Sequence, residues 1–146
     1  SVNQTMSRRL RVSMDLSAVA GTAKDSFSLG GTQRGLAVRG LPAGYAKGQG
    51  AGTVSLEAEY MAFPVQRGAQ DSPLFLDGVS WALFCDGGVA GNRAAPFKRV
   101  VTAGVEMRAT GTLGYGLTRG DLRLGVARAL DGAQPWRVYW GIGSGF

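Results

Sequence analysis

The feature that most constrains this chain is an alternation of apolar and polar residues that recurs along its length. In residues 9–20, apolar side chains stand at every even position, and the odd positions from 9 to 17 are polar. A period of two places these sets on opposite faces of a β-strand, whereas a helix would scatter them around its circumference. We therefore predict a strand with one apolar and one polar face.

The same pattern returns five more times. The predicted strands span residues 9–20, 53–63, 79–89, 101–109, 121–126 and 137–146. Pro64 is expected to end the second of them, because proline cannot donate to a strand ladder. Residues 21–52 are different: this segment is long, glycine-rich and not periodic. A connection of that length in a compact domain is normally functional or disordered.

Glycine content excludes the main helical alternatives. The chain has 24 glycines in 146 residues, more than twice the ordinary share of about 7%. So much glycine would destabilise every helix of a bundle or coiled coil. We therefore predict an all-β fold.

Two architectures fit such strands. Segments of about 9–11 residues cross a bilayer when tilted, and aromatic residues near strand ends are typical of the interfacial girdles of membrane barrels. The predicted apolar faces are free of charge, except that Arg128 breaks the fifth one near its end, just beyond residues 121–126. These features favour an antiparallel up-and-down transmembrane β-barrel. The alternative is a soluble β-sandwich binding module, in which the apolar face meets a second sheet.

Several kinds of chemistry find no support in the residues. The chain has no histidine and a single cysteine, Cys85, so the usual general base, a zinc site and an internal disulfide are not expected. The net charge is +6, but the basic residues are mostly spread singly. We expect no catalytic residues, no metal, no cofactor and no nucleic-acid partner.

Four segments of the chain carry a family resemblance. Gly30-Gly31 followed by Val38-Arg39-Gly40-Leu41 resembles the loop motif of the outer-membrane assembly barrel superfamily, which includes BamA and TamA. Leu41 stands where the family usually has Phe or Tyr. Segments 55–57 and 84–88 resemble the family's acidic strand and its Phe-x-Asp-x-Gly element. The chain's end resembles the terminal-strand signal through Trp140, Gly141, Ile142 and Phe146.

The resemblance implies a location and a function. Residues 1–146 would form the C-terminal part of a barrel domain, with about six strands and a long loop, residues 21–52, folded inward. The upstream strands of that barrel and any periplasmic domains would be absent from this chain. The barrel would lie in the bacterial outer membrane and insert or translocate polypeptides. Its partners would be outer-membrane lipid and lipopolysaccharide, client polypeptides and the missing N-terminal strands. The alternative within the superfamily is a barrel that anchors a fused enzyme or propeller.

The alternation also predicts where the motif residues point. Glu57, Phe84 and Asp86 fall on the polar faces of their strands, so all three should point into the barrel interior. The resemblance implies that Arg39 pins the loop there through Glu57 and Asp86, with Phe84 packed against the loop. Other interpretations stay open: Arg39 as a solvated loop residue, its pairing with Glu59 or Glu106 in place of Glu57, and Asp86 as a turn residue.

Overall fold

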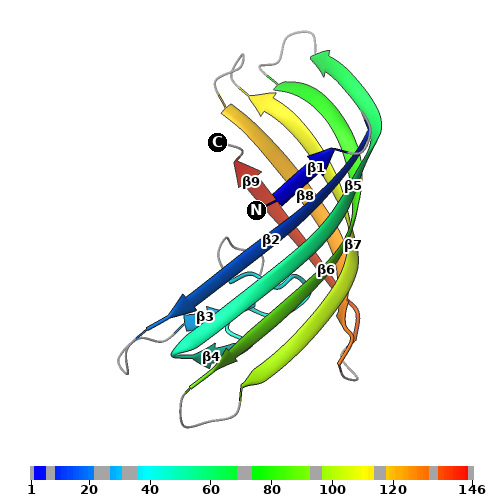
Figure 1. Ribbon diagram of the computed structural model, residues 1–146. Coiled ribbons are helices and arrows are strands. Elements are labelled where there is room, and N and C mark those ends of the chain that lie inside the picture. Colours follow the sequence, from blue (N-terminus) through cyan, green and yellow to red (C-terminus); the bar gives the residue numbers. More distant parts are fainter. Residues whose placement is uncertain are drawn as a thin grey trace.

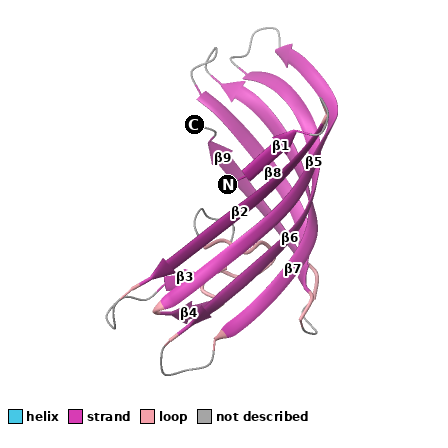
Figure 2. Cartoon of the chain, viewed as in Figure 1, coloured by secondary structure: helices cyan, strands magenta, loops and turns pink. Residues whose placement is uncertain are grey.

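The computed structural model describes residues 2–5, 9–21, 27–30, 36–68, 74–92, 97–113, 118–131 and 135–144. All regular secondary structure in these ranges is β-strand, so the predicted all-β fold is confirmed (Figures 1 and 2). The strands are β1 (Val2–Thr5), β2 (Leu10–Ala20), β3 (Phe27–Leu29), β4 (Ala46–Gly48), β5 (Gly50–Gly68), β6 (Leu74–Gly91), β7 (Lys98–Leu113), β8 (Thr118–Ala129) and β9 (Arg137–Ser144). The described residues contain no helix with the length and apolar character needed to span a membrane.

Seven strands form one antiparallel sheet. Its order is β1-β2-β5-β6-β7-β8-β9, so each strand lies beside the next one in the chain except where β3 and β4 are inserted. β3 and β4 pair with each other in a separate two-stranded sheet. The large sheet curves strongly and stays open, with β1 and β9 as its edges (Figure 1).

The strands differ from the prediction in number and length. β1 was not predicted, β5 has 19 residues, and the short fifth strand is the 12-residue β8. β5 also continues through Pro64, so the expectation that this proline ends the strand is wrong. Register shifts between β5 and β6 flank Pro64. A bulge interrupts the period of two and accommodates a residue without an N–H. The part of β5 beyond the bulge therefore does not continue the alternation from which the strand was predicted.

The outward face of the large sheet is apolar and uncovered. Its residues align across the strands in rows; one row is Val12, Ala58, Leu83, Val105, Val126 and Val138. Leu83 is 65% exposed and Val138 is 72% exposed. In the part of the chain that the structure describes, no second sheet packs on this face, although a sandwich would require one.

The buried core lies on the opposite, concave face. Part of segment 21–52 folds onto that face, as Figure 1 shows for β3, β4 and residues 36–45. The core residues of this segment pack on small or β-branched residues of the sheet: Leu29, Val38, Leu41 and Ala46 against Ala51, Ala90, Val100 and Ala129. The concave face of the sheet is therefore covered in part by residues of this segment.

Candidate functional site

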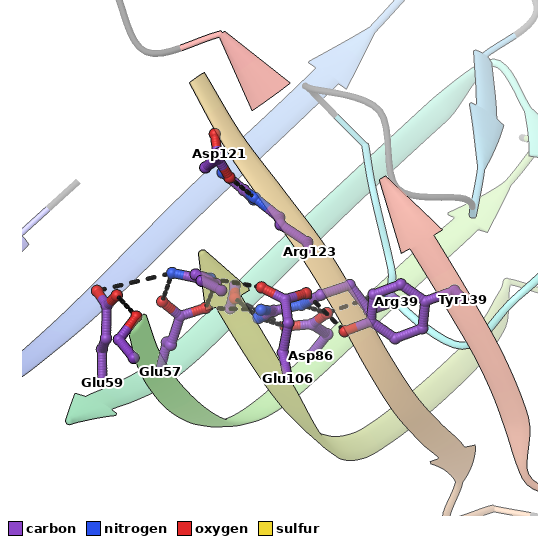
Figure 3. A network of polar contacts seen from close by, with 11 residues as sticks. Arg39, Glu57, Glu59, Asp86, Glu106, Asp121, Arg123 and Tyr139 are labelled. Carbon is purple, nitrogen blue, oxygen red and sulfur yellow. Dashed lines mark hydrogen bonds and ion pairs between the residues drawn. The ribbon is translucent and has the colours of Figure 1, made fainter. Parts of the chain in front are cut away.

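Arg39 lies in the turn before β4, and its side chain reaches Asp86 on β6 (Figure 3). Its Nε and Nη2 atoms donate to the two carboxylate oxygens of Asp86, each at 2.8 Å. The backbone N–H of Arg39 also donates to Asp86, at 3.0 Å. Two parallel charge-assisted bonds from one guanidinium give both strength and a fixed orientation.

Further contacts complete the surroundings of this guanidinium. Nη1 donates to Glu57 on β5 at 2.6 Å, and Nη2 donates to the hydroxyl of Ser55 at 3.0 Å. The guanidinium carbon lies 3.7 Å from the ring centre of Phe84, a favourable cation–π distance. The structure thus brings Arg39 together with Glu57, Phe84 and Asp86.

The ion pairs are largely shielded from water. The side chains of Arg39 and Asp86 are 12% and 3% exposed, which is incompatible with a solvated loop arginine. Burial lowers the pKa of the Arg39 guanidinium, but the hydrogen bonds and charges of Asp86, and then of Glu57, outweigh burial, so its pKa is raised above the ordinary value. Arg39 therefore remains charged.

The other motif residues fit the loop to the sheet. Val38 and Leu41 are buried in the core, so both contribute apolar packing to it. Gly40 has a φ of +81°, and a Cβ on it would lie 2.5 Å from the Cβ of Ala127. A side chain at Gly88 would come within 3 Å of Leu29 and Val38. Gly40 needs glycine for its positive φ and its close approach to Ala127. At Gly88 a methyl group would press on the ends of two buried side chains.

A second arginine, Arg108 on β7, was missed by sequence reasoning. It donates to both oxygens of Glu57, at 2.7 and 2.6 Å, and to Glu106 at 2.5 Å. Glu59 lies 3.7 Å from it and accepts a bond from Ser80. Glu57 is thus shared by two arginines, whereas Glu59 and Glu106 pair with Arg108. The signal was available, because Glu106 and Arg108 share the polar face of their predicted strand.

The described residues of the terminal-strand signal, which are Trp140, Gly141 and Ile142, do not join this network. Trp140 and Ile142 lie on the outward face of β9 and are 70% and 78% exposed. Gly141 stands between them, and Phe146 lies outside the described residues. Within the described ranges, no group of three or more histidine, cysteine, aspartate or glutamate side chains is arranged to hold a metal ion.

Comparison of the chain with protein-family models, with curated proteins and with solved structures finds no match. Its function is therefore inferred from the contacts described above and from the motifs of the sequence. What these contacts accomplish physically is to hold the loop turn against β5 and β6.

Removing one partner of Arg39 tests how firmly the loop is held. Asp86→Ala leaves a largely buried guanidinium without its main counter-ion, and we expect it to lower the free energy of unfolding by about 3–5 kcal/mol. Asp77→Ala is the matched control, because its partner Arg119 is 66% exposed and such a pair contributes about 0–1 kcal/mol. Denaturant unfolding of both variants measures the difference. Equal losses would show that Arg39 is not held as described.

A pair of glycine substitutions tests the fit of the loop. Gly88→Ala should loosen the loop, because the new methyl group meets Leu29 and Val38, and overpacking of this kind costs about 1–3 kcal/mol. Gly141→Ala has open space around it and should leave the loop unchanged. Limited proteolysis within residues 36–48 reports loop docking. If Gly88→Ala resists protease as well as the original protein, the loop does not depend on this close approach.

Proposed function

We propose that this chain is the C-terminal part of an outer-membrane β-barrel of the assembly and translocation superfamily, in which Arg39 locks a long loop inside the barrel. The observation that carries the proposal is the contact of Arg39 with Asp86, Glu57 and Phe84. The motifs come from three separate parts of the chain. Their meeting at one guanidinium is what the resemblance implies.

The connections between strands support a barrel with two unlike ends. At one end of the sheet, β1–β2, β5–β6 and β7–β8 are joined by four, five and four residues. At the other end, six residues join β6–β7, seven join β8–β9, and residues 21–49 join β2 to β5. Short turns on the periplasmic side and longer loops outside are typical of outer-membrane barrels. In this arrangement the locked loop enters from the cell exterior.

The open edges support a barrel completed by further strands. Unpaired backbone groups in hydrocarbon cost several kcal/mol each, so an open sheet is not viable there. Seven strands are also fewer than the roughly eight of the smallest barrels. Strands that precede β1 in the full-length protein would close the barrel against β9. By the resemblance, that seam opens to let a client polypeptide add its own strand.

A matched pair of substitutions tests whether the outward face contacts hydrocarbon. Leu83 and Leu130 are 65% and 63% exposed, but Leu83 is central in β6 and Leu130 follows the end of β8. Leu83→Arg should cost about 2–4 kcal/mol in a bilayer, whereas Leu130→Arg, near the interface, should cost about 0–1 kcal/mol. Unfolding of the full-length protein in phospholipid vesicles measures both. Small and equal costs would place this face in water.

Charge reversal tests the role of the lock in the activity. Arg39→Glu replaces the counter-ion of Asp86 and Glu57 with another carboxylate, and we expect it to slow insertion of a client barrel into vesicles at least about tenfold, the equivalent of ~1.4 kcal/mol. The double change Arg39→Glu with Asp86→Arg should restore part of the rate. Arg119→Glu is the control for an exposed arginine. A normal rate for Arg39→Glu would contradict the proposed function.

A further inference from the structure

The terminal strand β9 is attached to the rest of the molecule in two ways. Its backbone pairs with β8, its one neighbour among the strands that the structure describes. Its outward side chains Val138, Trp140 and Ile142 are 70–78% exposed. On the inward side, Gly141 and Gly143 have no side chains. Among the described side chains of β9, Tyr139 is the one that forms a hydrogen bond with a side chain of another strand.

Tyr139 reaches two strands across the sheet. Its hydroxyl donates to Glu106 on β7 at 2.7 Å (Figure 3). The path is open because Glu106, Gly125 and Tyr139 are successive partners in one row of the sheet. A side chain at Gly125 would collide with the Tyr139 ring. Glycine on β8 therefore allows the tyrosine to lie across that strand.

The contacts of Tyr139 lead back to Arg39 by two routes. Through polar groups, Glu106 binds Arg108, Arg108 binds Glu57, and Glu57 binds Arg39. Through aromatic rings, Tyr139 packs edge-on against Phe84, with ring centres 6.3 Å apart, and Phe84 lies under Arg39. These six residues form a closed ring of contacts that joins the loop, β5, β6, β7 and β9.

We propose that Tyr139 is a positioning residue that couples the docked loop to the terminal strand. When Arg39 leaves its partners, Phe84 and Glu57 each lose a contact. The two residues that Tyr139 contacts, Phe84 and Glu106, are then held less firmly. β9 then depends mainly on its ladder with β8. The inference concerns the state of the strand edge, and its meaning for a barrel seam rests on the proposed function.

Hydrogen exchange of the full-length protein in vesicles tests the coupling. The readout is the exchange rate of the β9 amides that bond to β8. Tyr139→Phe removes only the hydroxyl, and Arg39→Lys keeps the charge but loses the planar fork. We expect each to speed exchange in β9 about tenfold, as loss of a hydrogen bond to a charged group allows. The double variant should be no faster than the faster single variant, because the changes interrupt one network.

The control is Tyr60→Phe, a tyrosine on the outward face of β5 that is 47% exposed, and it should leave β9 exchange unchanged. Arg39→Lys speeding exchange only within residues 36–48, with β9 as in the original protein, would overturn the inference. Additive effects in the double variant would overturn it as well. The two proposals fail separately. If β9 responds as expected while Arg39→Glu inserts clients normally, the coupling stands and the proposed function fails.

Discussion

The structure depends on a guanidinium buried among carboxylates. Taking a charge out of water costs several kcal/mol unless it is paired and fully hydrogen-bonded, and Arg39 meets that condition only where Asp86, Glu57 and Ser55 converge. Those residues lie on two strands that must keep one register. The position of the loop and the register of β5 against β6 are therefore set together, although 47 residues separate Arg39 from Asp86.

Small residues make room for these contacts. Gly40 meets Ala127, Gly88 faces Leu29 and Val38, and a side chain at Gly104 would strike the ring of Phe84. The abundant glycine that disfavours helices thus also leaves space for the loop on the concave side of the sheet. Large apolar side chains stand on the other face. The same strands therefore carry small residues on the concave face and large apolar side chains on the outward face. Alternation makes this possible, because successive side chains of a strand point to opposite faces.

The local sequence pattern predicted most of the strands and the face on which each side chain lies. It did not predict which side chains of different strands are in contact. A period of two placed Glu57, Phe84 and Asp86 on the inner face, because that property depends only on neighbouring residues. The extent of β5 escaped the pattern, because bulges shift the alternation. The partners of Arg108 and Tyr139 escaped it too, since contacts two strands apart depend on curvature and register. The position of Tyr139 beside Gly125 follows from the register of β8 against β9, which the sequence pattern does not give.

The sharing of Glu57 has a consequence for a chain whose loop has swung out. Glu57 would keep Arg108 as its counter-ion, so departure of the loop would leave only Asp86, with the Ser55 hydroxyl, lacking a cation. Glu57, Glu59 and Glu106 would keep Arg108 beside them, and Asp86 would be the carboxylate that loses its arginine. A largely buried carboxylate without its counter-ion attracts a positive group. The site that Arg39 leaves would therefore attract the same arginine back.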